Sequence, residues 1–545
     1  MLPMRFECLR PREVPHLTRI AGAYLSDFSQ VAGYYEHPPT LDGVRAAAAS
    51  VPSGRREELI VALRALNQLL GPEGHLDASV GRALDRLATG AVAVVAGQQT
   101  GLFTGPAYTL YKALTAIHVA KELTAAGTDA VPVFWLASED HDLAEVDHAD
   151  WLTRQGLEHI ELPRETSTDG HRVGEIALGH DVARAVACAS NSLDGPGAEA
   201  IGSALASSYT PAETYSSAFG KLFARLFQGR GLILFDPLDP GLAALAVPVL
   251  QKALRETAVL VADLISRSKA LEHAGYHAQV KVTESATLLF AMLDGRRLPL
   301  RVRNSGLAAG PRHFPLGELL ALEERSPGAL SPSALLRPVV QDSLLPTAAV
   351  ITGPAEMAYF AQSHVLYRRL LGRMPAVLPR EGFTLVEPHV ARMLKKYKLD
   401  LPDVLRGSQH LRRRLERESV PRALARQMTL GDRNLRRYLE RIRKPLRKLD
   451  PTLTGALDTA QRKMLYQLDK LRTRAGRAAD HREELLDRHE RILREALAPH
   501  HDLQERTLCA LPLLARQGLE LLDALEERSH GFVGAGGACH HIAFL

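Results

Sequence analysis

Short apolar runs alternate with amphipathic helical patterns along the first 380 residues. Five runs predict buried strands, at residues 92–96, 131–137, 232–235, 279–282 and 348–351, and each is bounded by Gly, Pro or acidic residues. A helical pattern over residues 107–123 separates the first two runs. A strand, a helix and a second strand in this order form a right-handed βαβ unit, so the pattern predicts an α/β domain with a parallel sheet.

The pattern changes near residue 384 to long helices rich in arginine. Apolar residues recur every seventh position from Leu457 to Ile492, and an earlier run from Met428 to Leu449 keeps this spacing. Sustained heptads predict a coiled coil, although one helix packed on the core is the alternative. The Asp450-Pro451 break predicts that the coiled coil folds back as an antiparallel hairpin.

A further helical pattern over residues 506–527 would bring the chain back to the first domain. We expect a flexible loop over residues 531–537 and then a packed tail at His540 and His541. The predicted domains are an α/β core at 1–383, a helical arm at 384–505 and a returning helix and tail at 506–545.

Charge divides along the same boundary. The 545 residues carry a net charge of +5, but residues 401–500 hold 25 Lys and Arg against 14 Asp and Glu, a net of +11. A basic arm could bind RNA phosphates. The only aromatic side chains for base stacking in residues 401–500 are Tyr438 and Tyr466. The composition therefore favours a dimerisation helix over nucleic-acid binding.

Cysteine spacing and apolar run lengths bear on the compartment. The four cysteines form no Cys-x-x-Cys pair, which suggests neither a disulfide framework nor a cysteine zinc site. The N-terminus lacks the apolar run of a signal peptide, and no apolar stretch approaches the roughly 18 residues that span a bilayer. We expect a cytoplasmic protein with no membrane partner.

A glycine-rich segment, Ala96-Gly-Gln-Gln-Thr-Gly-Leu-Phe-Thr-Gly-Pro106, follows the first strand and opens a helix. Its glycines permit positive φ, and a helix N-terminus with free N–H groups binds phosphate or carboxylate. The spacing matches neither the P-loop nor the dinucleotide fingerprint. A turn needed only for chain geometry is the alternative. The expected ligand-binding residues are Gln98, Gln99, Thr100, Gly101, Thr104, Gly105 and, on the exposed side of the helix, Tyr108 and Lys112.

The second strand contains Trp135 and ends in four ionisable residues, Glu139, Asp140, His141 and Asp142. Ligands bind beyond the carboxyl ends of strands in open α/β sheets, so these side chains should lie beside the glycine-rich segment. Close like charges shift a carboxyl pKa and suit acid–base catalysis. The cluster could instead hold a substrate ammonium or a divalent metal, but no metal-binding spacing matches and we assign no metal.

A third segment repeats the arrangement of the first. Residues 348–351 form an apolar strand, which Thr-Gly-Pro and a helix follow. An arginine fork nearby suits a bidentate carboxylate. The candidate binding residues are Arg337, Gln341, Asp342, Gly353, Glu356, Tyr359 and Arg380.

Together the three segments resemble the bacillithiol biosynthesis BshC family of cysteine-adding enzymes. The resemblance rests on Gly97-Gln-Gln-Thr-Gly, Glu139-Asp-His-Asp and Arg337-Pro-Val-Val-Gln-Asp with Gly353-Pro-Ala-Glu. It implies a Rossmann-like core with connecting insertions and a homodimer formed through the coiled coil. It also implies a ligase that joins the carboxylate of L-cysteine to the amine of glucosaminyl-malate.

This reaction needs an activated carboxyl group. The strand, glycine loop and helix share the layout with which one class of aminoacyl-tRNA synthetases binds ATP, an analogy of fold that leaves the cofactor unassigned. Our hypothesis is that Asp140 or His141 takes the proton of the amine while the helix start at Gly105 stabilises the anionic acyl carrier. The alternatives are a nucleotide-binding protein whose arm binds RNA and a metal-dependent hydrolase using the acidic cluster.

Overall fold

The computed structural model describes residues 4–15, 17–52, 56–303, 306–419, 422–478, 483–529, 531–533 and 538–545. The chain forms two compact units, which divide between Thr384 and Leu385 and again between Gln504 and Glu505. The larger unit contains residues 6–384 and 505–542. The smaller unit contains residues 385–504 and the two chain ends. Both divisions fall one residue from the domain boundaries expected from the sequence.

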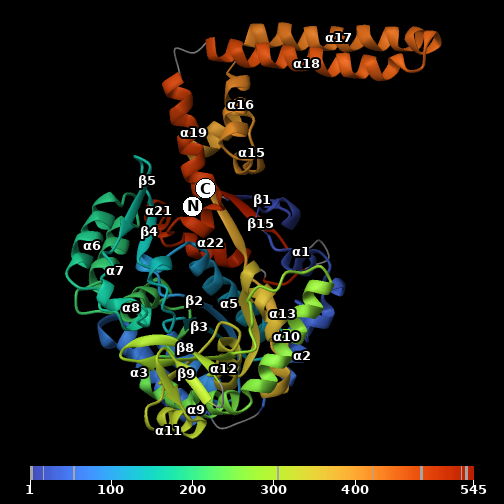
Figure 1. Ribbon diagram of the computed structural model, residues 1–545. Coiled ribbons are helices and arrows are strands. Elements are labelled where there is room, and N and C mark those ends of the chain that lie inside the picture. The colour runs from blue at the N-terminus through green and yellow to red at the C-terminus, as the bar shows by residue number, and fades with distance from the viewer. Residues whose placement is uncertain are drawn as a thin grey trace. The chain divides into compact units, whose positions relative to one another are not determined.

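A five-stranded parallel sheet is the centre of the larger unit (Figure 1). Its order is β13 (Ala376–Pro379), β12 (Thr347–Thr352), β2 (Val92–Gln98), β3 (Ala130–Leu136) and β6 (Ile233–Phe235). The strands read as continuous apolar runs because helices cover both faces of such a sheet. The predicted α/β fold with a parallel sheet is confirmed, and four of the five predicted strands lie in this sheet.

The connections run outward from the two central strands. β2 leads through α5 (Tyr108–Ala125) to β3, whereas β12 leads through α13 (Pro354–Leu370) to β13 on the other side. Right-handed crossovers in opposite directions place the two helices on opposite faces of the sheet. A crevice therefore opens between the carboxyl ends of β12 and β2, which is where ligands bind in this architecture.

The prediction of a strand at residues 279–282 is wrong. These residues form no strand, and the side-chain amide of Gln362 takes the place of a neighbouring strand. Its Oε1 accepts from the Val280 N–H at 2.9 Å, and its Nε2 donates to the Val280 carbonyl at 2.9 Å. The fifth strand is β13, which the pattern hid because proline precedes and ends its short apolar run.

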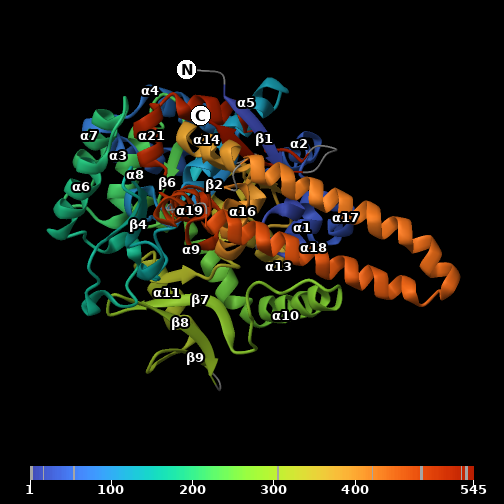
Figure 2. The same cartoon turned by 90° about the horizontal axis from the view of Figure 1, so that it is seen from above.

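An antiparallel sheet is inserted between the strands of the core. Its order is β10 (Arg312–Phe314), β9 (Gly306–Ala309), β8 (Arg296–Arg303), β7 (Ala286–Leu293) and β11 (Leu330–Pro332), and Figure 2 shows β7, β8 and β9 side by side. A separate hairpin pairs β4 (His148–Leu152) with β5 (Leu157–Glu161). Near the chain ends, β1 (Arg5–Leu9), β15 (His540–Phe544) and β14 (Gly382–Val386) form a third sheet.

Helices complete the larger unit. They are α1 (Arg19–Ser26), α2 (Leu41–Ala49), α3 (Glu57–Leu70), α4 (Ala78–Ala88), α6 (Asp181–Ser192), α7 (Ala198–Ser208), α8 (Tyr215–Leu226), α9 (Pro240–Arg255), α10 (Thr257–His273), α11 (Leu316–Arg325) and α12 (Arg337–Leu344).

The returning segment differs from the single helix predicted over residues 506–527. It forms three short helices, α20 (Gln504–Thr507), α21 (Leu511–Gln517) and α22 (Leu521–Arg528). Leu508 and Cys509 interrupt the helix because they form β-bridges with Asp150 and Pro106, and Gly518 ends α21 with φ of 89°. Residues 534–537 of the predicted loop lie outside the described part of the chain.

One disulfide departs from the expected absence of paired cysteines. Cys8 and Cys539, 531 residues apart, are joined. No spacing in the sequence indicates this pairing, because the two cysteines meet only when the chain ends come together beside β1 and β15. His540 and His541 lie in β15 and are buried, which agrees with the predicted packing of the tail.

The smaller unit is helical. It comprises α14 (Pro388–Tyr397), α15 (Leu401–Leu405), α16 (Ser408–Glu418), α17 (Arg422–Leu449), α18 (Leu453–Ala478) and α19 (Glu483–Leu497). Both views show α17 and α18 side by side (Figures 1 and 2).

The predicted antiparallel hairpin is confirmed at the Asp450-Pro451 break, where the Asp450 carboxylate accepts from the Thr452 N–H at 2.8 Å. Arg443 pairs with Asp458 across the hairpin at 2.7 Å. Residues 479–482 of the heptad run lie outside the described residues. Within the described ranges, no helix has the length and apolar character needed to cross a membrane.

Asn67 of α3 closes the outer edge of the core sheet. Its amide donates to the Leu234 carbonyl at 2.8 Å and accepts from the Leu234 N–H at 2.8 Å. Asn67→Leu has a similar volume but leaves both buried backbone groups unpaired, so we expect the free energy of unfolding to fall by about 1–3 kcal/mol. Urea denaturation measures the change. Gln68→Leu, at an exposed neighbour, should change stability by less than about 0.5 kcal/mol, and equal losses would contradict the assignment.

Candidate functional site

A cavity of about 660 Å³ lies at the carboxyl ends of β2, β3 and β12. This volume is in the range of small-molecule sites. Thirteen of the residues expected from the sequence line it: Gln98, Gln99, Tyr108, Lys112, Trp135, Glu139, Asp140, His141, Arg337, Gly353, Glu356, Tyr359 and Arg380. The three segments are thus brought together. The cavity is also lined by residues that sequence reasoning did not select, among them Glu145, Val280, Phe290, Arg297, Ser333 and Arg506.

The structure places the other seven candidates away from the cavity wall. Thr100, Gly101, Thr104 and Gly105 are buried in the turn before α5, Gln341 and Asp342 are buried in α12, and Asp142 is exposed.

The turn before α5 is buried because distant segments cover it. The Phe103 N–H donates to the Tyr209 hydroxyl at 2.9 Å, and the Ala107 N–H donates to the Leu508 carbonyl at 2.8 Å. Backbone φ is positive at Phe103, Thr104 and Gly105 in succession. Leu508 thus occupies the N–H of Ala107, the residue before α5, and Gly105 does not line the cavity, whereas Tyr108, the first residue of α5, does.

Lys112 is buried rather than on an exposed side of α5, with 3 % of its side chain accessible. Its Nζ lies 2.5 Å from the Glu356 carboxylate of α13. It also donates to the Gly97 carbonyl and the Gln98 amide oxygen, both at 2.9 Å. Burial alone would raise the pKa of Glu356, but the Lys112 charge and the Gly353 N–H hold this pKa below its ordinary value. The carboxylate is therefore ionised, and Lys112 joins β2, α5 and α13.

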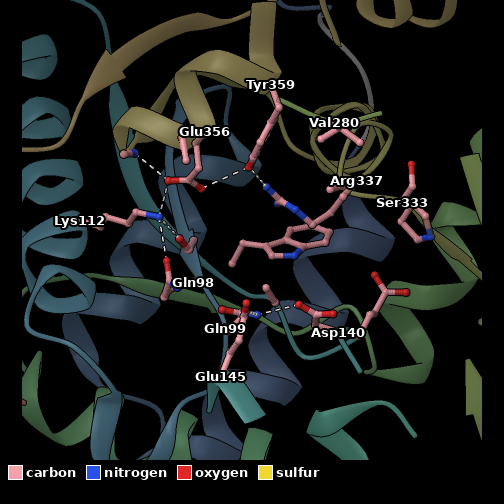
Figure 3. Close-up of a pocket in the computed structure, with 18 of the residues that line it drawn as sticks. Gln98, Gln99, Lys112, Asp140, Glu145, Val280, Ser333, Arg337, Glu356 and Tyr359 are labelled. Carbon is pink, nitrogen blue, oxygen red and sulfur yellow. Dashed lines mark hydrogen bonds and ion pairs between the residues drawn. The ribbon is translucent and has the colours of Figure 1, made fainter. Parts of the chain in front are cut away.

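A chain of hydrogen bonds extends this ion pair along one side of the cavity (Figure 3). Tyr359 donates to Glu356 at 3.3 Å and accepts from the Arg337 guanidinium at 3.2 Å. Arg337 also donates to Gln341 at 3.2 Å, so Gln341 helps to fix the orientation of the guanidinium. Arg337 is the first residue of α12, and its neutral hydrogen-bond partners leave its positive charge available to a ligand.

Carboxylates gather on another side of the same cavity (Figure 3). The Gln99 amide nitrogen donates to Asp140 and to Glu145, each at 2.7 Å. Burial would raise the pKa of Asp140, but the hydrogen bonds from the His141 backbone N–H and from Gln99, together with the charge of Arg297, hold it well below its usual range. Asp140 is therefore an ionised carboxylate and a weak proton acceptor.

The pKa of Glu139 is shifted in the opposite direction to that of Asp140. Burial raises the pKa of its carboxyl group despite the opposing charges of Arg297 and Arg172. It lines the cavity beside Trp135, whose buried indole Nε1 has no acceptor among the described residues. Gly97 permits this arrangement, because a Cβ there would lie 3.0 Å from the Trp135 carbonyl oxygen.

Arg297 is the main functional candidate that sequence reasoning missed. It lies in β8 of the inserted sheet, 156 residues from the His141 ring that it contacts. The Asp294-Gly295 pair between β7 and β8 is a hairpin signal that could have located the strand. Nothing in a hairpin pattern, however, shows which of its residues reach a distant cavity.

The acidic cluster does not form a metal-binding arrangement in the described part of the chain. No three His, Cys, Asp or Glu side chains there are grouped as metal ligands. The polar atoms of Asp140 and His141 instead face Gln99 and Arg297.

The fold and the cavity define a Rossmann-like α/β protein with a cavity at the sheet's central crevice and a helical arm. Residues 4–381 match the family model "Bacillithiol biosynthesis BshC, N-terminal Rossmann-like domain" and residues 383–534 match "Bacillithiol biosynthesis BshC, C-terminal coiled-coil domain". The chain belongs to the bacillithiol biosynthesis BshC family.

Relatives match over nearly the whole chain. A protein of Koribacter versatilis named "Putative cysteine ligase BshC" is 40 % identical over 98 % of both chains. Proteins with the same name from Solibacter usitatus and Symbiobacterium thermophilum are 38 % and 32 % identical, over 95 % and 94 % of this chain and 96 % and 97 % of theirs.

Removing one partner of the buried ion pair tests its role. Lys112→Met leaves the Glu356 carboxylate without its cation, and we expect the free energy of unfolding to fall by about 3–5 kcal/mol. The double variant Lys112→Met/Glu356→Gln removes both charges and should lose less than the single variant. Denaturant titration of the three proteins measures this. A double variant as unstable as Lys112→Met would contradict the interpretation.

Proposed function

We propose that this protein is a cysteine ligase of bacillithiol biosynthesis and that its cavity joins the carboxyl group of L-cysteine to the amine of glucosaminyl-malate. Family membership and the names of the relatives support the ligase class. The observation that carries the finer proposal is the placement of a guanidinium and of several carboxylates on separate sides of one cavity. Arg337, hydrogen-bonded to neutral Tyr359 and Gln341, lies on one side, and Glu139, Asp140 and Glu145 lie on another, with Arg297 beside Asp140.

This separation suits the two substrates. Glucosaminyl-malate carries carboxylates and an amine, and cysteine carries a carboxylate and an ammonium group. A guanidinium binds a carboxylate with two parallel hydrogen bonds, so we assign Arg337 to a substrate carboxylate. The acidic side attracts an ammonium group and orients it by hydrogen bonds. The indole N–H of Trp135 provides one more donor for a substrate oxygen.

Of the clustered residues, Glu139 best suits the role of proton acceptor. The attacking amine must lose a proton as its nitrogen bonds to the carboxyl carbon. An acceptor works best when its pKa approaches the working pH, and burial moves the pKa of Glu139 in that direction. Asp140 is held ionised by its partners and is better suited to orient the ammonium through charge.

A nucleotide would supply activation of the cysteine carboxyl as an acyl phosphate or adenylate. The fold analogy would place its phosphates at the start of α5, but Leu508 already accepts from the Ala107 N–H there, so this backbone donor is not available to a phosphate. We therefore assign no residue to a nucleotide and derive no step through it.

The direct test is to incubate the purified protein with L-cysteine and glucosaminyl-malate, with and without ATP and Mg²⁺, and to follow the amide product by mass spectrometry. The proposal expects product in at least one condition and its loss in Arg337→Gln, chiefly through a higher KM. If no condition yields product while the folded protein binds neither substrate, the proposal is wrong.

The proposed role of Glu139 as proton acceptor predicts that kcat/KM depends on pH. A base acts in its deprotonated form, so kcat/KM should fall as the pH drops through the Glu139 pKa, which lies above its ordinary value of 4.5. Glu139→Gln should lower kcat by about 100-fold or more and remove this acidic limb. Glu161→Gln, at an exposed glutamate of β5, is the matched control. Near-normal activity of Glu139→Gln would rule out the role.

We also propose that the arm forms a homodimer. Met464 and Leu471 belong to the heptad seam, yet 46 % and 54 % of their surfaces are exposed in the single chain. Met464→Lys/Leu471→Lys should convert a dimer to a monomer in sedimentation analysis. Gln467→Lys, at an exposed polar position of the same helix, should remain a dimer. A wild-type monomer at micromolar concentration would contradict this assignment.

A further inference from the structure

The inserted antiparallel sheet delivers one arginine to the cavity. Arg297 is the second residue of β8, just after the Asp294-Gly295 turn, and only 8 % of its surface is exposed. Its backbone N–H donates to the Gly170 carbonyl at 2.7 Å. The side chain thus starts from a backbone that is held on both sides, by the hairpin and by the segment before α6.

Three contacts fix the plane of the guanidinium. Nη2 donates to the Pro332 carbonyl at 2.7 Å, and Nε donates to the Ser331 hydroxyl at 3.0 Å. The face of the group lies 3.8 Å from the centre of the Phe290 ring, a favourable cation–π distance. With two nitrogens and one face occupied, the direction of the remaining nitrogen, Nη1, is set.

Nη1 lies 3.0 Å from Nδ1 of His141. A guanidinium has only donors, so the imidazole nitrogen in this contact must accept. Nδ1 therefore carries no proton, and the proton of the neutral ring is on Nε2. The Asp140 carboxylate, 3.4 Å from the same Nδ1, would favour the opposite tautomer. Arg297 is 4.0 Å from that carboxylate and offsets its charge.

We propose that Arg297 is a positioning residue that holds His141 as the neutral Nε2–H tautomer, so that His141 serves the cavity as a hydrogen-bond donor and not as a base. The inference rests on the proposed ligase function for its chemical meaning. His141 lines the cavity, and its Nε2–H would donate to the carboxyl oxygen on which negative charge develops when the amine attacks. No bond to His141 forms or breaks. As the C–N bond forms, the amine proton passes to the Glu139 carboxylate proposed above as its acceptor, and the bond from the carboxyl carbon to its activated oxygen breaks.

The tautomer can be measured without any activity. In the full-length protein labelled with ¹⁵N-histidine and held in alkaline buffer, the His141 signals should show an unprotonated Nδ1 and a protonated Nε2. His141→Gln identifies these signals. Arg297→Gln should shift the ring toward the Nδ1–H form beside Asp140. A protonated Nδ1 in the wild-type protein, or an unchanged pattern in Arg297→Gln, would overturn the proposal.

A double-variant cycle separates positioning from a general loss of stability. In the ligase assay, Arg297→Gln and His141→Gln should each lower kcat by on the order of 100-fold with little change in KM. If Arg297 acts through His141, Arg297→Gln should have almost no further effect in the His141→Gln background. Effects that multiply in the double variant would show that Arg297 acts by another route.

Arg303→Gln is the matched control, since Arg303 is an exposed arginine at the far end of the same strand. It removes the same charge and should leave both the tautomer and kcat unchanged. Should the ligase assay yield no product at all, the histidine signals still decide the tautomer. Failure of the proposed function is thus distinguishable from failure of this inference.

Discussion

The buried ion pair between Lys112 and Glu356 is the interaction on which the site depends. The two helices that carry these residues leave the sheet from neighbouring strands, β2 and β12, and then diverge. A crevice between diverging helices has no packing of its own to fix its width. The pair provides that restraint, and it is satisfied at every polar atom by the Gly97 carbonyl, the Gln98 amide oxygen and the Gly353 N–H. The orientation of Arg337 depends in part on the pair, because Tyr359, which accepts from Arg337, donates to Glu356.

The sequence was a good guide where a chemical group directly follows a buried strand. Glu139 and Asp140 follow β3 and Gln98 ends β2, so the rule that ligands bind at the carboxyl ends of strands correctly predicted that these side chains lie together. The same reasoning predicted the helical hairpin, because a heptad repeat and a proline break are both local signals.

The sequence was a poor guide where burial is decided from far along the chain. Thr100 and Thr104 have the residue types of a ligand-binding loop, but both are buried in a turn whose Phe103 and Ala107 are hydrogen-bonded to Tyr209 and Leu508. Residues 279–282 read as a strand, yet a single glutamine side chain satisfies the backbone there. Arg297 reaches the acidic cluster from an insertion with its own sheet. Each outcome depends on a contact between segments more than 80 residues apart, which no periodicity records.

The late position of Glu505 has a consequence for synthesis of the chain. Arg380 is 8 % exposed and pairs with Glu505 at 2.6 Å, and Arg506 beside it lines the cavity. Glu505 and Arg506 emerge from the ribosome only after the whole of residues 385–504. A nascent chain that has completed its parallel sheet therefore holds an arginine whose counterion has not yet been made. The order of translation makes the cavity wall one of the last parts of the larger unit to be completed, and a chain stopped in the arm would lack the carboxylate with which Arg380 pairs.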